Sequence, residues 1–513
     1  MIGREMTLGQ AASLVAGARV EGEDGTLFRG LAYDSRRATA GDLFFAVPGF
    51  EKDGAAYVAD AVRNGAVAVV AREPAAAPVP RLLVSDVRAA MGRIAARFFG
   101  DPSRELLCVG VTGTNGKTTV ASLVAGILEA TGMSPGVLGT VAYRVGGVEE
   151  RAPRTTPEAP DLHALLRRML DAGNRSVALE VSSHAIALGR VAGLSLDAIV
   201  FTNLSRDHLD FHGTMDAYYE TKRSVFLRAG LDALGAEAAR AVVNVDDDAG
   251  RRLAAETDLP LTTFGMAATR ADVRLSIGAC DLSGSDLAVE SARGSFRCRL
   301  PLPGLFNQRN ALAAIAAAIA LDLPLPAIRE GIEGARPVPG RLEPVPNALG
   351  ITILVDYAHS PDAIAALLDS IRPLVAGRII TLFGCGGNRD RGKRPLMGRA
   401  AGAGSDFVVL TSDNPRREEP EAILADVAPG LRETGTPFVV VADRRAAIAR
   451  ALDEAKPGDT VVLAGKGHED YQEIGERRLA FRDAGVAEEL VREREREGKK
   501  RGMGGGASRG DRG

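Results

Sequence analysis

Cysteine and tryptophan are scarce in this sequence, and no two cysteines are close along the chain. Its 513 residues contain no tryptophan and four cysteines, which are Cys108, Cys280, Cys298 and Cys385. Because a C-x-x-C pair is lacking, neither a disulfide framework nor a cysteine-based zinc site is expected. Sparse, unpaired cysteines are typical of a protein of the reducing cytoplasm.

An excess of charge of one sign is lacking as well. The sequence carries 63 Lys and Arg against 66 Asp and Glu, a net charge of −3. A nucleic-acid-binding surface would show as a basic excess or stripe, so we expect no nucleic-acid partner. The apolar runs of ~18–20 residues that a membrane span needs are missing, and Met1–Thr7 does not resemble a signal peptide. We therefore expect a cytoplasmic monomer without a membrane span.

The length suffices for about three domains of ~100–200 residues each. A turn-forming cluster, Gly100-Asp101-Pro102-Ser103, ends the first region, and Arg336-Pro337-Val338-Pro339-Gly340 is typical of a linker. After residue 491 the chain alternates Arg with Glu, which can extend a helix, and then becomes rich in Gly and Arg. We predict domains at 1–104, 105–337 and 338–491, followed by a disordered tail at 492–513.

Apolar strands alternate with amphipathic helices through the second and third regions. Ser176–Val181 and Ala198–Asn203 are apolar runs that end in polar residues, which is typical of the buried, mostly parallel sheet of an α/β protein. We therefore predict an α/β protein with a small α/β first domain, a central P-loop sheet domain and a Rossmann-like last domain. The last domain has five expected strands, at Ile351–Val355, Ile379–Phe383, Phe407–Leu410, Phe438–Val441 and Thr460–Leu463.

A glycine-rich loop, Gly113-Thr114-Asn115-Gly116-Lys117-Thr118-Thr119, lies between an expected strand (Leu106–Val111) and an expected helix (Val120–Leu128). At such a turn backbone N–H groups and the helix N-terminus can surround phosphate oxygens. Lys117 would neutralise the β- and γ-phosphates of ATP, and the Thr118 hydroxyl would hold Mg²⁺. The usual P-loop spacing requires glycine at position 111, where this chain has Val111. The loop nevertheless predicts an ATP site.

Histidines and acids follow the two strands expected next to this loop. Glu180 and His184 follow the first strand, and Asn203, His208 and His212 follow the second. Because the carboxyl ends of parallel strands meet at one sheet edge, Glu180 and His208 are expected near the ATP loop, where they could hold a second Mg²⁺. Taken alone, Lys222 is typical of a solvated lysine on an amphipathic helix.

These motifs occur in an order that resembles one family, the Mur ligases of peptidoglycan synthesis. After the glycine-rich loop come Glu-Val-Ser-Ser-His (180–184), Asp-His-Leu-Asp-Phe-His (207–212) and Lys222. The resemblance continues through Gly-Leu-Phe-Asn-Gln-Arg-Asn (304–310), Gly-Arg-Leu-Glu (340–343) and Asp-Tyr-Ala-His (356–359). It covers nearly the whole chain except the tail.

The resemblance implies an ATP-dependent ligase that forms an amide through an acyl phosphate, with Mg²⁺ and four catalytic residues, Lys117, Glu180, His208 and Lys222. Lys222 would be carbamylated, which turns a cation into an anionic ligand of the second metal. The metal ligands would be Thr118, Glu180, His208 and carbamylated Lys222. By the same resemblance the ATP contacts would be Gly113, Thr114, Asn115, Gly116, Lys117, Thr118, Thr119, Asn307, Asn310, Arg341 and Asp356.

Within the family the match favours the members that add meso-diaminopimelate to UDP-N-acetylmuramoyl-L-alanyl-D-glutamate. Asp34-Ser35-Arg36 and Gly41-Asp42-Leu43-Phe44 carry this part of the resemblance, together with Asp413-Asn414-Pro415-Arg416. One departure is Leu188, where the family often has Gln, so a contact there must be lost or replaced. The contacts to the nucleotide substrate would be Ser35, Thr155, Thr156, Ser182 and Arg190.

The choice of amino acid is expected to depend on Arg416, because a guanidinium can bind the distal carboxylate of diaminopimelate bidentately and L-lysine has none. The diaminopimelate contacts would be Arg389, Asp413, Asn414, Pro415, Arg416, Gly465 and Glu469.

Three alternatives remain open on the sequence. An L-lysine-adding homologue would lack the arginine at position 416. A folylpolyglutamate synthetase shares the ATP loop but would not need the first domain that contains Ser35. A P-loop ATPase switch would have no use for Lys222 or for the last domain.

Overall fold

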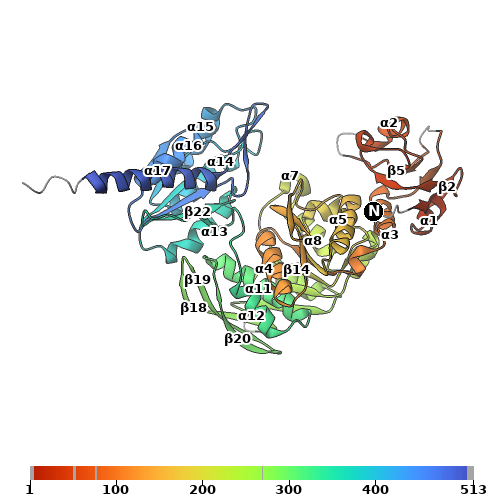
Figure 1. The fold of residues 1–513 in the computed structure, drawn as a ribbon, viewed down its shortest axis with the longest axis horizontal. Helices are drawn as coiled ribbons and strands as arrows, with labels where there is room; N and C mark the ends of the chain where they lie inside the picture. The colour runs from red at the N-terminus through yellow and green to blue at the C-terminus, as the bar shows by residue number, and fades with distance from the viewer. Residues whose placement is uncertain (1–4, 50–52, 75–77, 269, 505–513) are drawn as a thin grey trace, which may run out of the picture. The chain divides into compact units, whose positions relative to one another are not determined.

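The computed structural model describes residues 5–49, 53–74, 78–268 and 270–504, with side chains as far as residue 497. The chain divides into two compact units (Figure 1). The first comprises Met1–Ser276, Ala288–Cys298 and Arg309–Gly334, and the second comprises Ile277–Leu287, Arg299–Gln308 and Ala335–Gly513.

The first unit begins with a five-stranded sheet of order β2-β7-β6-β5-β4, in which β4 to β7 run parallel and β2 is antiparallel to β7. Alternate residues of β5 face two separate apolar clusters: Leu43 and Phe45 pack with α3, and Phe44 packs with α2. The elements are β1 (Met6–Thr7), α1 (Leu8–Ser13), β2 (Arg19–Glu21), β3 (Leu27–Phe28), β4 (Gly30–Ala32), β5 (Asp42–Phe45), α2 (Val58–Arg63), β6 (Ala68–Ala71), β7 (Arg81–Leu83) and α3 (Val87–Phe98).

The central sheet has eleven strands in the order β11-β10-β9-β12-β8-β14-β16-β17-β18-β19-β20. From β9 to β18 each neighbouring pair is parallel, whereas β10 is antiparallel to both β9 and β11. The strands are β8 (Leu107–Thr112), β9 (Pro135–Leu138), β10 (Ala142–Val145), β11 (Val148–Arg151), β12 (Ser176–Glu180), β14 (Ala198–Phe201), β16 (Ala241–Asn244), β17 (Leu261–Gly265), β18 (Val273–Asp281), β19 (Gly284–Ser291) and β20 (Gly294–Leu300).

The parallel core of this sheet is as predicted, whereas its two edges were not anticipated. The residues of β8, β12 and β14 are almost all buried, because helices cover both faces of a parallel sheet. In β18 and β19 buried and exposed residues are mixed, a pattern that helix-and-strand alternation does not predict. A short separate pair joins β13 (Ser195–Leu196) to β15 (Glu237–Ala238).

Helix α4 (Lys117–Ala130) packs on β8, β9 and β12, and α12 (Leu325–Glu333) packs on α4. Their approach is close, since a Cβ at Gly331 would lie 2.4 Å from Ile127 Cα. The other helices from the middle of the chain are α5 (Ala159–Asp171), α6 (Ser183–Ala187), α7 (Leu209–His212), α8 (Met215–Ser224), α9 (Arg228–Leu234), α10 (Asp248–Glu256) and α11 (Leu305–Ala320).

The second unit contains a six-stranded sheet of order β21-β22-β26-β23-β24-β25, parallel except for β21 (Figure 1). The five strands predicted for this region are all present, with ends that differ by one residue at most. The strands are β21 (Glu343–Pro344), β22 (Thr352–Asp356), β23 (Ile379–Phe383), β24 (Phe407–Leu410), β25 (Phe438–Val440) and β26 (Thr460–Ala464), and a hairpin is formed by β27 (Tyr471–Ile474) and β28 (Arg477–Ala480).

The helices of this unit cover both faces of its sheet, and two apolar clusters lie between helices and strands. The last helix continues to Gly504, past the boundary predicted at residue 491, and Arg494 in it pairs with Asp453. Residues 505–513 of the predicted tail lie outside the described part of the chain. The helices are α13 (Pro361–Ile371), α14 (Lys393–Gly404), α15 (Pro420–Arg432), α16 (Arg444–Glu454) and α17 (Asp483–Gly504).

Candidate active site

The phosphate loop (Gly113–Thr119) joins β8 to α4 and lies tightly against its neighbours. Gly113 has φ +144° and Gly116 has φ +88°, backbone conformations that side chains disfavour. A Cβ at Gly113 would lie 1.9 Å from Thr202 Oγ1, and one at Gly116 would lie 2.3 Å from Asn310 Oδ1. The two glycines are therefore required by conformation and by space.

Residues that follow β14 hold the first half of the loop. The Asn203 carbonyl accepts from Thr114 N at 2.9 Å, and its side-chain Oδ1 accepts from Asn115 N at 3.0 Å. Thr202 Oγ1 donates to the Asn115 carbonyl at 2.6 Å. The amides of Lys117, Thr118 and Thr119 belong to the first turn of α4, where no intrahelical carbonyl can reach them. An anion at this loop would therefore be met by the N-terminus of α4.

Two lysines approach the same carbonyl of the loop. Lys117 Nζ donates to Gly113 O at 2.9 Å and to Thr114 O at 2.8 Å, and Lys222 Nζ donates to Gly113 O at 3.0 Å. Lys222 also lies 3.4 Å from Thr112 Oγ1, and its Nζ is 4.8 Å from the centre of the Tyr218 ring. Two like charges beside one carbonyl favour loss of a proton from one of them.

Lys222 is buried, contrary to what its sequence position alone suggests. Its exposed fraction is 1%. Burial lowers the pKa of Lys222 well below its ordinary value, and the nearby Lys117 lowers it further. The amine is therefore disposed to be neutral, which is the form that reacts with an electrophile.

Glu180 ends β12 beside the loop, as predicted. It is 1% exposed, and both carboxylate oxygens accept hydrogen bonds from Thr140: Oε1 from the amide at 2.7 Å and Oε2 from the hydroxyl at 3.0 Å. A Cβ at Gly139 would lie 2.5 Å from Glu180 Oε1. Glu180 is thus a carboxylate held in one position by neutral donors, with no cation bound to it among the described residues.

The histidines predicted near this edge do meet. His184, after β12, packs edge-on against His208, after β14, with ring centres 4.9 Å apart. His208 has φ +53°, and the His212 ring lies 5.7 Å from that of His184. Burial, with the neighbouring His208 and His212, lowers the pKa of His184 to about 4. Burial also lowers the pKa of His208, and Lys117 and Lys222 act in the same direction.

The donor chemistry at this edge fits Mg²⁺. Thr118 offers a hydroxyl at the start of α4, Glu180 a carboxylate, and His208 an imidazole that its lowered pKa keeps neutral. Within the described residues no three His, Cys, Asp or Glu side chains gather into a cage for a metal ion. Mg²⁺ is usually held by one or two carboxylates together with phosphates and water, so a sparse protein donor set suits it.

The residues predicted to contact the nucleotide substrate gather around the end of β12. Thr156 Oγ1 donates to Glu180 O at 2.8 Å and accepts from Ser182 N at 3.2 Å. Thr155 Oγ1 lies 3.0 Å from Thr140 Oγ1, and Arg190 Nη1 donates to Thr156 O at 3.4 Å. Four of the five predicted residues are thereby linked to Glu180.

A cluster of three arginines around one carboxylate adjoins these threonines. Glu158 is 7% exposed; its Oε1 lies 2.9 Å from Arg190 Nε and 2.9 Å from Arg154 Nη1, and its Oε2 lies 3.6 Å from Arg88 Nη1. Three guanidinium groups share one carboxylate in this Glu158 cluster (Arg88, Arg154, Glu158 and Arg190). Its charge is +2, which suits a polyanionic ligand.

The departure at Leu188 has a structural counterpart in the same cluster. Arg88, on α3, donates from Nη1 to the Leu188 carbonyl at 3.1 Å. The backbone at this position is thus engaged by an arginine whose guanidinium lies beside Glu158.

Ser35, the fifth residue predicted for the nucleotide substrate, begins a short 3₁₀ helix capped by Asp34. Ser35 is buried, and its carbonyl accepts from Asn64 Nδ2 at 2.8 Å. A small cavity of about 70 Å³ lies beside it, lined by Leu31, Ala32, Tyr33, Asp34, Arg37 and Asp161. The Tyr33 hydroxyl donates to Asp161 on α5, which fastens the first sheet to the central part of the unit.

The second unit contains Asn307, Arg341 and Asp356. Asn307 Nδ2 donates to Pro303 O at 2.8 Å, and the Arg341 guanidinium lies 4.8 Å from the centre of the Tyr357 ring. Asp356 is buried, which raises its pKa, and its oxygens accept from the amides of Leu342 at 2.9 Å and Ala358 at 2.8 Å. Asp356 therefore shapes the turn after β22.

The residues predicted for the amino acid meet at the carboxyl ends of β24 and β26. Asn414 Nδ2 and Lys466 Nζ both donate to Glu469 Oε2, at 2.9 and 3.0 Å. A Cβ at Gly465 would lie 3.0 Å from Asp413 Oδ2, so glycine keeps this space open. We refer to Asp413, Asn414, Arg416, Gly465 and Glu469, which are predicted to bind the amino acid, as the amino-acid pocket.

Arg416 and its neighbours line one side of this pocket. Arg416 has φ +53°; its Nη1 donates to Gly387 O at 2.9 Å, and its Nε donates to Glu473 Oε2 at 3.1 Å. A Cβ at Gly387 would lie 1.9 Å from Pro415 O, so the two loops touch. Arg389, in the same glycine-containing loop, is exposed.

A buried ion pair contacts the two strand ends that precede these residues. Arg444 and Asp483 are both fully buried, with Nη2 2.6 Å from Oδ2. Arg444 also donates to Ser412 O at 3.1 Å and Ala464 O at 3.0 Å, at the ends of β24 and β26. Removing either partner would leave a buried charge uncompensated, at a cost of about 3–5 kcal/mol.

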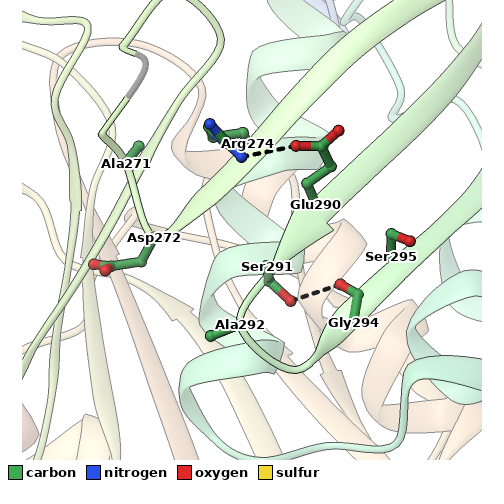
Figure 2. A pocket seen from close by; sticks show the side chains of 8 residues that line it. All are labelled: Ala271, Asp272, Arg274, Glu290, Ser291, Ala292, Gly294 and Ser295. Atoms are coloured by element: carbon green, nitrogen blue, oxygen red, sulfur yellow. Dashed lines mark hydrogen bonds and ion pairs between the residues drawn. The ribbon is translucent and has the colours of Figure 1, made fainter.

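An open hollow of about 460 Å³ lies on another surface of the first unit (Figure 2). Arg274 and Glu290 in this hollow form an ion pair, with Nη2 2.8 Å from Oε2, and Ser291 Oγ donates to Gly294 O at 3.0 Å. None of the predicted site residues lines it. In the described part of the chain no helix is long and apolar enough for a membrane span.

Comparison with known proteins gives matches along most of the chain. Three family descriptions match in order: "Mur ligase family, catalytic domain" at residues 27–99, "Mur ligase middle domain" at 111–318 and "Mur ligase, glutamate ligase domain" at 340–467. A Geobacter metallireducens protein named UDP-N-acetylmuramoyl-L-alanyl-D-glutamate–2,6-diaminopimelate ligase is 44% identical over 497 residues, 93% of this chain and 97% of the relative. The chain belongs to the Mur ligase family.

Further relatives and solved structures agree with this assignment. A Solibacter usitatus protein with the same name is 44% identical over 465 residues, 90% of this chain and 93% of its own. A solved structure bearing that name matches with a TM-score of 0.69 and 32% identity, covering 96% of this chain and 99% of that one. The structure of a MurF ligase from Thermotoga maritima in complex with ADP shares the fold, with a TM-score of 0.57 and 20% identity over 92% of this chain and 98% of that one.

The predicted family and three-domain α/β architecture of this Mur ligase are confirmed, whereas the roles of individual residues and the domain boundaries stay predictions. Thr140, Arg88, Arg154 and Glu158 in the first unit were not predicted from the sequence. Lys466 and Glu473 in the second unit were not predicted either. Lys466 could have been found, since it lies between the predicted Gly465 and Glu469 and is fully buried.

Proposed function

We propose that this Mur ligase joins meso-diaminopimelate to the D-glutamate of UDP-N-acetylmuramoyl-L-alanyl-D-glutamate, with cleavage of ATP to ADP and phosphate. The observation that carries the proposal is that relatives 44% identical over 93% and 90% of this chain bear the name of that enzyme. The proposal also places the enzyme in the cytoplasm, acting as a monomer.

The first step activates a carboxylate, which is a poor electrophile. An oxygen of the D-glutamate carboxylate attacks the γ-phosphorus of ATP, the bond to the β–γ bridging oxygen breaks, and ADP leaves. Lys117 and the N-terminus of α4 would stabilise the charge on the phosphates. Mg²⁺ bound by Thr118, and by Glu180 with His208, would neutralise the phosphates and the carboxylate that meet there.

In the second step the amine attacks the carbonyl carbon of the acyl phosphate, loses a proton, and phosphate leaves with both electrons of the C–O bond. Asn307, Arg341 and Asp356 are proposed as further ATP contacts because of the family resemblance. The Glu158 cluster supports binding of an anionic substrate, since its net charge of +2 is not balanced within it. Thr155, Thr156 and Ser182 would add hydroxyls beside it.

Lys222 is proposed to be carbamylated. The Nζ lone pair would attack the carbon of CO₂, and release of one proton would leave an anionic carbamate. The burial of Lys222 and its lowered pKa support this reaction, because it requires the neutral amine. The carbamate would replace the repulsion between Lys222 and Lys117 by attraction and would supply an oxygen donor for Mg²⁺.

The amino-acid pocket supports diaminopimelate over lysine. Arg416 can bind the distal carboxylate, and Asp413 and Glu469 can accept from ammonium groups. Arg389 and the Asn414 amide are proposed to complete these contacts. Lysine would leave Arg416 without a carboxylate ligand, and sites built on polar pairs discriminate strongly against such analogues.

The test is release of phosphate from ATP in the presence of UDP-N-acetylmuramoyl-L-alanyl-D-glutamate, with meso-diaminopimelate, L-lysine or no amine. Release that depends on diaminopimelate would support both the reaction and the specificity. Release with lysine in its place would leave the chemistry intact and contradict the specificity. Phosphate release that does not depend on any amine would favour an ATPase switch.

A further inference from the structure

The loop that contains Arg416 is held by the β27–β28 hairpin. Arg416 N donates to Glu473 O at 3.0 Å, and Gly475 N donates to Arg416 O at 2.6 Å. Arg416 forms a parallel bridge with Ile474. The hairpin thus fixes a residue whose backbone is left-handed, a conformation that is unfavourable for a non-glycine residue.

Hydrogen bonds of side chains also join the same hairpin to Asp413 and Asn414. Glu473 N donates to Asn414 Oδ1 at 2.9 Å, and Gln472 Nε2 donates to Asp413 O at 2.7 Å. Glu473 is therefore fixed by its backbone at both Asn414 and Arg416. These two backbone contacts place the Glu473 carboxylate beside Arg416.

The Glu473 carboxylate contacts one edge of the Arg416 guanidinium. Of the five N–H groups of arginine, Nε–H donates to Glu473 Oε2 and one Nη1–H donates to Gly387 O. Within the part of the chain that the structure describes, the N–H groups on Nη2 and the second one on Nη1 donate no hydrogen bond. Nε–H and one Nη1–H are thus occupied, whereas both N–H groups on Nη2 and the other one on Nη1 are available for a ligand.

We propose that Glu473 is a positioning residue that sets the amine specificity of this enzyme by holding Arg416 with its Nη1–Nη2 edge toward the distal carboxylate of the substrate. This inference rests on the proposed function. A carboxylate bound to that edge makes two parallel N–H···O bonds, which require a fixed guanidinium plane. An Arg416 released from Glu473 would lose side-chain entropy on each binding event.

The Arg416–Glu473 ion pair also suits a substrate that is zwitterionic at its distal end. Arg416 and Glu473 together carry no net charge, and both side chains are partly exposed, at 26% and 33%. The distal centre of meso-diaminopimelate bears one carboxylate and one ammonium group. A balanced pair attracts such a centre without a general preference for anions.

The experiment begins with the wild-type enzyme and then compares Glu473→Ala and Glu473→Gln in the phosphate-release assay. In Glu473→Ala the KM for meso-diaminopimelate should rise about tenfold, and kcat should be nearly unchanged, because the reacting amine is at the other end of the substrate. Glu473→Gln retains an oxygen that accepts from Nε, so its KM should rise about two- to threefold. The KM for ATP should stay the same in both.

A double-mutant cycle distinguishes positioning from a separate contact. If Glu473 acts through Arg416, Glu473→Ala should add nothing in the Arg416→Ala background. If Glu473 bound the substrate ammonium directly, the two effects would add, and the inference would be overturned. The matched control is Glu476→Gln in the same hairpin, where Glu476 is 87% exposed and pairs weakly with Arg417 at 3.7 Å. Its kinetics should equal those of the wild type.

Different experimental results would overturn this inference and the proposed function. An unchanged KM for meso-diaminopimelate in Glu473→Ala, with wild-type thermal stability, would overturn the role of Glu473 and leave the ligase intact. A wild-type enzyme that releases no phosphate with meso-diaminopimelate would overturn both.

Discussion

The region around the phosphate loop and the amino-acid pocket differ in how far their cationic side chains are matched by acidic ones. In the first region three arginines share Glu158, which gives the Glu158 cluster a charge of +2. In and beside the pocket two cations are paired with acids: Arg416 with Glu473, and Lys466 with Glu469. The first region is built with positive charge in excess, whereas the second is built with charge in balance.

This difference matches the substrates that we propose. ATP and the nucleotide sugar are polyanions, so a surplus of positive charge lowers their binding free energy. Diaminopimelate carries equal numbers of carboxylates and ammonium groups at neutral pH, so a surplus of either sign would favour the wrong ligand. Charge balance in each region therefore indicates the kind of molecule that it binds.

The largest effect should follow from changing Lys222. Both Lys222→Ala and Lys222→Arg should lower kcat for phosphate release about a hundredfold or more, because neither can provide an anionic donor at the metal. Arginine keeps the positive charge, so near-normal turnover in Lys222→Arg would contradict the carbamate. Partial recovery of Lys222→Ala with added short carboxylic acids would support it.

The next effect concerns the balanced region. Arg416→Ala and Arg416→Lys should each raise the KM for meso-diaminopimelate about tenfold or more, since a bidentate contact to the distal carboxylate is lost. Steady-state kinetics with the amine varied would measure this. Arg417→Ala is the control, because Arg417 is adjacent but 77% exposed; an equal effect of both substitutions would contradict the role of Arg416.

A smaller effect is expected in the Glu158 cluster. Arg88→Ala and Arg154→Ala should raise the KM for the nucleotide substrate about fivefold, as for a charge contact of roughly 1 kcal/mol. The KM for diaminopimelate should not change. Arg97→Ala, also on α3, removes an exposed pair with Asp101 and should have no effect. If Arg88→Ala and Arg154→Ala left the KM for the nucleotide unchanged, the cluster would not bind it.

The smallest effect is on stability at low pH. The pKa of His184 is about 4 in the folded protein and 6.5 ordinarily, so between these values the unfolded state binds more protons. The thermal midpoint should therefore fall as pH decreases from 6.5 toward 4. In His184→Asn this decrease should be shallower, which a pH series of melting curves would measure. Equal slopes in the two proteins would contradict the shift.

Much of the fold and part of the site could be predicted from the sequence, because local patterns determine them. The apolar runs of β23 and β24 and the glycine-rich loop between β8 and α4 are patterns of residues close along the chain. The meeting of His184 and His208 followed from the rule that parallel strands end at one edge. The family resemblance predicted a role for Lys222 at the ATP site, and the residue is buried beside Gly113, whereas its pattern alone suggested a solvated residue.

Contacts between distant segments could not be predicted in this way. Arg88 reaches Glu158 from 70 residues away, and Glu473 reaches Arg416 from a hairpin 57 residues later. Neither pairing leaves a local signal, because an arginine or a glutamate on a strand or helix is usually solvated. The charge balance of each region depends on these pairings, so it emerges only from the structure.

The most direct test of this charge comparison is the salt dependence of two KM values, measured between 50 and 300 mM added KCl, roughly a 2.5-fold change in Debye length. The KM for UDP-N-acetylmuramoyl-L-alanyl-D-glutamate should rise several-fold, because its site carries an excess of positive charge. The KM for meso-diaminopimelate should change little. Equal salt dependence of the two would contradict the account.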